Sequence, residues 1–147
     1  MQNSTHTQLR IQASLSETAV EGLFAGLVAG IAMLLYLLAA GLLSADAAST
    51  TLGRFSIQAP PNPLQGALLH LAVSAIYGLI FGIVWSLLGR RASSWVVAAL
   101  FALVIYLLAR FVLLPGSGSG LLHLAPIHFA LAHLVYGLTL GFWFRDR

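Results

Sequence analysis

Three histidines and two tyrosines have the clearest capacity for chemistry in this sequence. His70, His128 and His133 fall within apolar stretches, where ionisable side chains usually face the interior of a protein. His70 and His133 each lie seven residues after a proline that can begin a helix, Pro63 or Pro126. At about 1.5 Å per helical residue, both imidazoles are predicted at the same depth, about 10 Å inside the apolar layer.

Tyr36 and Tyr106 are predicted in the same layer, because each lies seven or eight residues from the outer end of its own apolar stretch. One interpretation is structural, with Tyr–His hydrogen bonds that satisfy buried polar groups and fix helix register. A second is cofactor binding, in which His70 and His133 hold a haem b iron axially, or one of them contacts a quinone headgroup beside Tyr36 or Tyr106. A histidine-based proton relay is a further alternative.

Other kinds of chemistry lack the residues that they need. The chain has no cysteine, which excludes disulfides, thiolate metal sites and thiol catalysis. No carboxylate lies in the middle of an apolar stretch to complete a zinc site or to drive coupled transport at the membrane midplane. We therefore predict no catalytic residues and no metal site, and a small transporter is a less favoured alternative. The four acids lie at or beyond the ends of these stretches: Glu17, Glu21, Asp46 and Asp146.

The elements that must position these residues are transmembrane helices. Of the 147 residues, 59% are hydrophobic and only 7% charged, with a mean hydropathy of +0.93; a soluble domain carries roughly a quarter charged residues. Four apolar stretches reach the length of about 20 residues that a bilayer requires, at about 19–43, 64–88, 94–114 and 121–144. We predict an all-α fold, a four-transmembrane-helix bundle at 19–147 after a polar N-terminal tail at 1–18. Pro126 is an alternative start for the last helix.

The arginines predict the orientation of this bundle, because cytoplasmic loops carry an excess of positive charge. Five arginines fall on one side and two, Arg54 and Arg110, on the other, which predicts cytoplasmic termini and external links at 44–63 and 115–120. The net charge of +3 is accounted for in this way, and nucleic acid is not predicted as a partner. The five arginines on the cytoplasmic side are Arg10, Arg90, Arg91, Arg145 and Arg147.

An internal repeat suggests that the bundle consists of two duplicated hairpins. Residues 67–82 read A-x-x-H-x-A followed by Y-G-L-x-x-G, and residues 125–141 repeat this pattern with one additional residue. Tyr-Leu-Leu-Ala occurs at both 36–39 and 106–109. Two hairpins that enter and leave the membrane in the same way are related by an axis along its normal.

The His…Tyr-Gly-Leu-x-x-Gly motif at 70–82 and 128–141 resembles one in small uncharacterised bacterial four-helix integral membrane proteins. This resemblance covers most of the chain and implies a multi-pass protein of the bacterial inner membrane without a known activity. By build, the chain is also similar to accessory subunits of bacterial respiratory and photosynthetic complexes.

Small residues at four-residue steps predict close helix packing, because transmembrane helices associate through backbone contact along such ridges. One bundle requires only some of these ridges, so other membrane subunits are expected as partners beside the lipid bilayer. We therefore predict a non-catalytic accessory subunit of a larger bacterial electron-transfer complex, with a haem- or quinone-binding protein as the alternative. The packing residues are Gly22, Gly26, Gly30, Ser74, Gly78, Gly82, Gly137 and Gly141.

Overall fold

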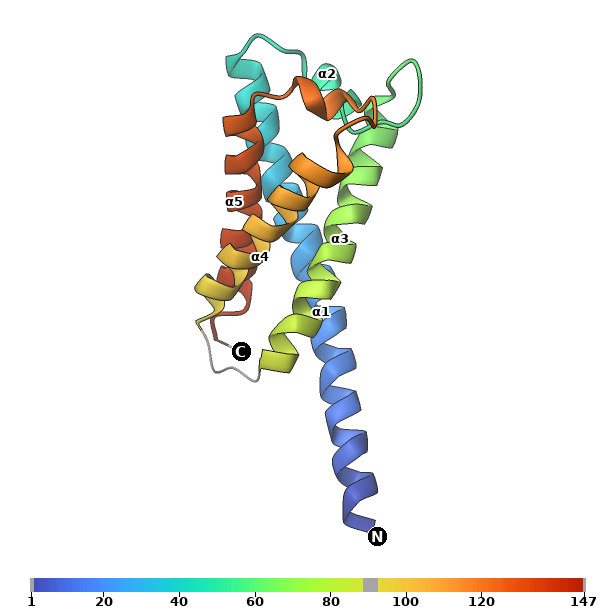
Figure 1. Ribbon diagram of the computed structural model, residues 1–147, viewed down its shortest axis with the longest axis vertical. Helices are drawn as coiled ribbons and strands as arrows, with labels where there is room; N and C mark the ends of the chain where they lie inside the picture. The colour runs from blue at the N-terminus through green and yellow to red at the C-terminus, as the bar shows by residue number, and fades with distance from the viewer. Residues whose placement is uncertain (1, 89–92, 147) are drawn as a thin grey trace.

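The computed structural model describes residues 2–88 and 93–146, and within these ranges the chain forms helices and links without any strand. Both chain ends lie toward one end of the bundle, and α2 lies at the opposite end, which we call the outer end (Figure 1). In chain order the elements are α1 (Gln2–Leu43), α2 (Ala48–Gly53), α3 (Pro63–Leu88), α4 (Ser94–Leu108), the π-helix η1 (Ala109–Leu113), the 3₁₀ helix η2 (Gly120–His123) and α5 (Pro126–Trp143).

Three helices are long and apolar enough to cross a membrane among the described residues: Leu15–Leu43, Pro63–Leu88 and Ser94–Leu113. The fold is thus all-helical and fits a protein embedded in a membrane. The remaining long helix, α5, is not in this set, because its 18 residues include His128 and His133, which lower its mean hydropathy.

Two helix boundaries differ from those predicted. Residues 2–18, predicted as a polar tail separate from the first helix, continue α1, which extends beyond the other helices (Figure 1). This segment contains no proline or glycine, so the helix propagates through it without a new nucleation step. The last helix begins at Pro126 rather than at 121, because η2 and an extended Leu124 precede it. Arg90, Arg91 and Arg147 lie outside the described residues.

The helix ends at the outer side have well-defined caps. At the end of α1, Ala45 adopts a left-handed conformation with φ of 63°. The Asp46 N–H donates to the Gly41 carbonyl at 2.9 Å and the Ala45 N–H to the Leu42 carbonyl at 3.1 Å, which together form a Schellman motif. Pro63 is the first residue of α3, the position where proline is favoured.

Helices α1 and α3 cross with their backbones in direct contact. A Cβ atom added to Gly26 would lie 2.7 Å from the Gly78 Cα and 2.9 Å from its nitrogen, and one added to Gly22 would lie 2.9 Å from the Gly82 Cα. The second close pair is α4 with α5, where Gly137 packs against Ala98 and Ala102. Because these ridges face each other within the chain, they carry no argument for an external partner.

An aromatic cluster fills the inner half of the bundle. The Phe81 ring of α3 makes edge contacts with Phe101 of α4 and with Phe144, which follows α5, both at 5.3 Å between centroids. Trp85 lies 6.1 Å from Phe144. The space between α3 and α4 is thereby closed on its inner side, one turn inward of Tyr77 and Ile105.

Candidate functional site

A cavity of about 440 Å³ lies between the outer halves of α3 and α4, above the aromatic cluster. Helix α4 packs mainly on α5 and makes little contact with α3. Among the described residues, hydrogen bonds join α1 to α3, α1 to α5, α3 to α5 and α4 to α5, whereas none joins α3 to α4. The cavity therefore lies between two neighbouring helices that no hydrogen bond joins within the described ranges.

The outer wall of this cavity includes the π-helix η1. The Leu114 N–H donates to the Ala109 carbonyl five residues earlier, at 2.9 Å. Ala109, Leu113 and Leu114 all line the cavity. Single π-turns inside α-helices occur frequently at functional sites, so the irregular part of α4 lies where a site is expected.

His70 lines the cavity from α3 and is 7% exposed. Its Nε2 donates to the Gly30 carbonyl of α1 at 3.0 Å, so that this bond also joins the two helices. The Phe55 ring, from the link between α2 and α3, packs against the imidazole with 4.7 Å between centroids.

His133 lines the same cavity from α5 and is also 7% exposed. Its Nδ1 donates to the Phe129 carbonyl one turn earlier, at 2.8 Å. The rings of Phe129 and Tyr106 contact the imidazole edge-on, at 4.6 Å and 5.6 Å between centroids.

These two bonds fix the tautomer of each imidazole, because a carbonyl oxygen can only accept, so the bonded ring nitrogen carries the proton. The second nitrogens, His70 Nδ1 and His133 Nε2, make no hydrogen bond within the described part of the chain. Both nitrogens keep some accessible surface. Among the described residues, the side-chain polar atom that is fully buried and has no hydrogen-bond partner is Thr51 Oγ1. No charged side chain lines the cavity, and in the neutral form of each ring the second nitrogen carries a lone pair.

Two tyrosines and two serines, Ser74 and Ser119, complete the polar part of the cavity. The Tyr136 hydroxyl donates to the Ser74 carbonyl at 2.7 Å and joins α5 to α3. Tyr77 also lines the cavity, and its hydroxyl makes no hydrogen bond within the described ranges. Neither tyrosine was among the predicted site residues, although both occupy the Tyr position of the repeated Y-G-L motif, which was the available signal.

The predicted layer of histidines and tyrosines is divided in the structure. His128 lies outside the cavity, where its Nδ1 pairs with the Tyr36 hydroxyl at 3.0 Å. His128 and His133 are five residues apart, which places them about 140° apart around a helix of 3.6 residues per turn. Tyr106 supports His133 from outside the cavity lining. The structure thus brings together His70 and His133 and assigns Tyr36 and His128 to a separate contact between α1 and α5.

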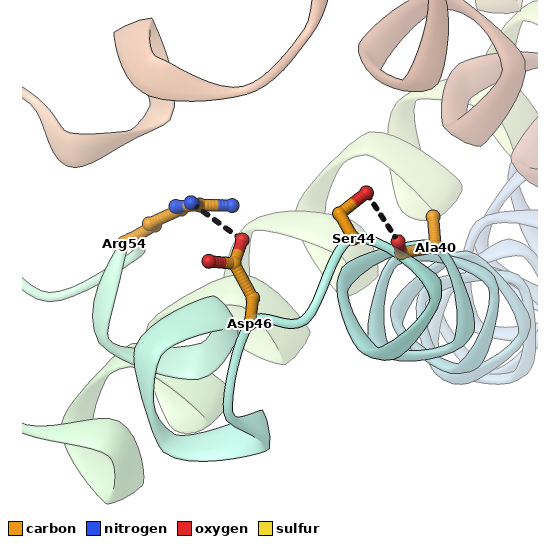
Figure 2. A network of polar contacts seen from close by, with 4 residues as sticks. All are labelled: Ala40, Ser44, Asp46 and Arg54. Atoms are coloured by element: carbon orange, nitrogen blue, oxygen red, sulfur yellow. Dashed lines mark hydrogen bonds and ion pairs between the residues drawn. The ribbon is translucent and has the colours of Figure 1, made fainter.

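A polar cleft of about 930 Å³ lies at the outer end and shares Phe55, Ile57 and Ser119 with the cavity. Arg54 lines this cleft. Figure 2 shows its guanidinium directed at the Asp46 carboxylate, and the ion pair, 2.7 Å long, anchors α2 near the end of α1. Phe55 and Ile57 therefore border both the polar cleft and the apolar cavity. Sequence reasoning missed this role, because the contacts of a link depend on how it folds back.

The donor set of the cavity differs from that of a protein metal centre. Within the described residues, no group of three or more His, Cys, Asp or Glu side chains lies close enough to hold a metal ion. Two imidazoles can still do one of two things. They can bind the metal of a cofactor that supplies its other ligands, or they can form hydrogen bonds to an organic ligand.

The chain belongs to a family of unknown function (DUF6789), whose model matches residues 16–146. The match begins within α1 and covers the other three long helices and both outer links. No curated protein and no solved structure matches the chain significantly.

Proposed function

We propose that this protein spans a membrane with four helices and binds a lipophilic small molecule, with its polar headgroup in the cavity between α3 and α4. The observation that carries this proposal is the pair of imidazoles, His70 and His133, that line one apolar cavity with an unpaired nitrogen each. Ligand sites are typically apolar concavities of about 300–1,000 Å³ with a few convergent polar groups. The cavity has this size and this composition.

The route to the cavity favours a ligand that arrives from the lipid. Val73 of α3 and Leu113 of η1 line the cavity and are 46% and 52% exposed, so its rim lies on the apolar outer surface of the bundle. A molecule with an apolar tail would leave that tail between these residues and place its headgroup against the histidines. Membrane quinones have this form, which links the proposal to electron-transfer membranes.

The four-span topology is part of the same proposal. The 18 residues of α5 measure about 27 Å at 1.5 Å per residue, close to the thickness of a bilayer core. Its two histidines are internal rather than lipid-facing, since one lines the cavity and the other pairs with Tyr36. We place the protein in a bacterial inner membrane with both termini in the cytoplasm, as the arginine distribution indicates.

A duplicated-hairpin origin is consistent with two unequal halves. If the hairpins are related by a two-fold axis, the contact between α1 and α5 corresponds to the contact between α3 and α4. The first contains the Tyr36–His128 hydrogen bond. The second contains the cavity and His70, and the duplication would have left one half closed and adapted the other for binding.

A b-type haem is the second candidate for the same site. Metal-bound histidines usually donate their other ring N–H to a carbonyl or carboxylate, and both His70 and His133 donate to a carbonyl. The cavity lining contains no arginine to pair with the haem propionates, so the organic ligand is favoured. A reduced-minus-oxidised absorption spectrum of the purified protein separates the two, because only haem gives Soret and α bands.

The predicted accessory role in a larger electron-transfer complex stays a proposal on narrower grounds. The small-residue ridges pack within the chain and leave only the exposed apolar faces, which lipid also covers. A ligand-binding subunit of such a complex is compatible with the site. Native gels after gentle extraction test this role, and a discrete monomer without co-purifying subunits would contradict it.

The binding proposal is tested by filling the cavity from its rim. Val73→Trp introduces an indole at a residue that lines the cavity and is already half exposed, so the helix tolerates it. Ile76→Trp is the matched control, since Ile76 is 57% exposed on the same helix and does not line the cavity. We expect solvent extraction of the purified protein to release a near-stoichiometric lipophilic molecule from the wild type and from Ile76→Trp, and little from Val73→Trp. Equal recovery from all three would contradict the proposal.

A further inference from the structure

We propose that the cavity selects a headgroup that donates hydrogen bonds, and therefore binds the reduced hydroquinone form of a membrane quinone more tightly than the oxidised quinone. This inference rests on the proposed function and specifies the chemistry of the ligand at that site. It follows from the hydrogen bonds that the two histidines already make.

Each histidine presents only an acceptor to the ligand. The His70 Nε2–H is held by the Gly30 carbonyl, and the His133 Nδ1–H is held by the Phe129 carbonyl. The remaining nitrogen of a neutral imidazole with one N–H is a lone-pair acceptor. To become a donor, either ring would have to flip and lose its carbonyl bond, or take up a proton where no carboxylate lines the cavity.

The two oxidation states of a quinone differ in what they offer to these acceptors. A hydroquinone carries two O–H donors, which can satisfy the lone pairs of His70 and His133. A quinone carries two carbonyl oxygens, which would face those lone pairs without a shared proton. Hydroxyls both donate and accept, and those of Ser74, Tyr77 and Ser119 also line the cavity, whereas the Tyr136 hydroxyl already donates to the Ser74 carbonyl. The preference for a donor therefore comes from the two histidines, which have no adaptable proton.

The expected selectivity follows from the number of hydrogen bonds that the hydroquinone makes and the quinone cannot. One buried polar group left unpaired on binding lowers the affinity by roughly tenfold, within a range of about 5-fold to 150-fold. By linkage, tenfold tighter binding of the reduced form raises the two-electron potential of the bound couple by about 30 mV.

The test compares three probes that share one tail: a decyl hydroquinone, the corresponding quinone, and the hydroquinone dimethyl ether, which has no donor. Thermal stabilisation of the wild-type protein in mild detergent reports binding, because a ligand of the folded state raises the unfolding temperature with concentration. The hydroquinone is measured anaerobically, with the reductant alone as a reference. We expect the hydroquinone to bind at least tenfold more tightly than the quinone and the ether.

The outcomes separate this inference from the proposed function. Equal affinity of hydroquinone and quinone, or tighter binding of the quinone, would overturn the donor selectivity and leave the binding site in place. No stabilisation by any probe would overturn both. Variants supply a second readout: His133→Met removes one acceptor and should reduce the preference, whereas His128→Met, which alters a histidine outside the cavity, should retain it. If His133→Met does not fold, the comparison of probes on the wild type decides alone.

Discussion

At the scale of single residues, the histidines of α3 and α5 fall into two kinds. His128 is paired through its Nδ1 with the Tyr36 hydroxyl. His70 and His133 each donate from one ring nitrogen to a backbone carbonyl, and the other ring nitrogen has no protein partner beside the cavity. The first arrangement fixes two helices relative to each other, and the second leaves capacity for a ligand.

Tyr36→Phe tests the structural kind of histidine. Removal of the hydroxyl leaves His128 Nδ1 without its partner, and we expect a loss of about 0.5–1.5 kcal/mol in the free energy of unfolding. Unfolding in mixed detergent micelles measures it. Tyr106→Phe is the control, because the Tyr106 hydroxyl makes no hydrogen bond within the described residues, and it should be nearly neutral. Loss of ligand binding in Tyr36→Phe without loss of stability would contradict this division.

The depth of the site residues in the membrane could be predicted from the sequence, but the side chains that they contact could not. Counting from Pro63 and Pro126 puts His70 and His133 at one level, because prolines fix where those helices begin. Whether two side chains at one level face each other depends on helix rotation and tilt, which apolar composition does not encode. The alternative match of His70 with His128, from the repeat, illustrates this, since the structure assigns His128 to another interface.

At the scale of elements, the crossing of α1 and α3 forms the rigid side of the bundle. Gly22, Gly26, Gly78 and Gly82 bring the two backbones together, and the His70 bond to Gly30 lies at the outer end of that seam. The position of His70 therefore depends on the close approach of these glycines.

Gly78→Ala is expected to destabilise the protein despite the higher helix propensity of alanine. The new Cβ would meet the Gly26 nitrogen at 2.6 Å and its Cα, which are backbone atoms that cannot rotate away. Overpacking of this kind costs about 1–3 kcal/mol, measured by the same unfolding assay. Ala72→Val, at an exposed position of α3, is the control and should change stability by about 0.5 kcal/mol or less. Equal effects of the two substitutions would indicate that the seam is not tightly packed.

Helix positions were predictable and local irregularities were not. The apolar stretches and the prolines locate the four long helices, whereas the π-turn at Ala109–Leu113 leaves no trace in composition, because it rearranges hydrogen bonds among the same apolar residues. The helical state of residues 2–18 was missed for a related reason: polar composition predicts solvent exposure, not the end of a helix.

At the scale of the whole molecule, the cavity results from unequal packing. Helix α1 holds α3 on one side and α5 on another, and α4 is attached mainly to α5. The aromatic cluster around Phe81 joins α3 and α4 only in the inner half. The outer half is left open toward the apolar surface, which is where the histidines lie.

The orientation across the membrane is testable because the chain has no native cysteine. We expect a cysteine introduced at Gln58, in the outer link, to react with a membrane-impermeant maleimide added to intact cells. A cysteine at Asp146, near the opposite end, should react only after the membrane is made permeable. Both positions are exposed in the structure, so access to the reagent is limited only by the membrane. Reaction of residue 146 in intact cells would reverse the orientation.

The most direct test of the central claim is to map where a ligand lies. A hydroquinone whose tail carries a diazirine next to the ring is photolysed in membranes that contain the protein, and the labelled residues are identified by mass spectrometry. We expect labels on the cavity segments 69–77 of α3 and 129–136 of α5, suppressed by excess unlabelled hydroquinone and by Val73→Trp. Labels confined to lipid-facing residues of α4 such as Leu100 and Val104, or unaffected by competitor, would contradict it.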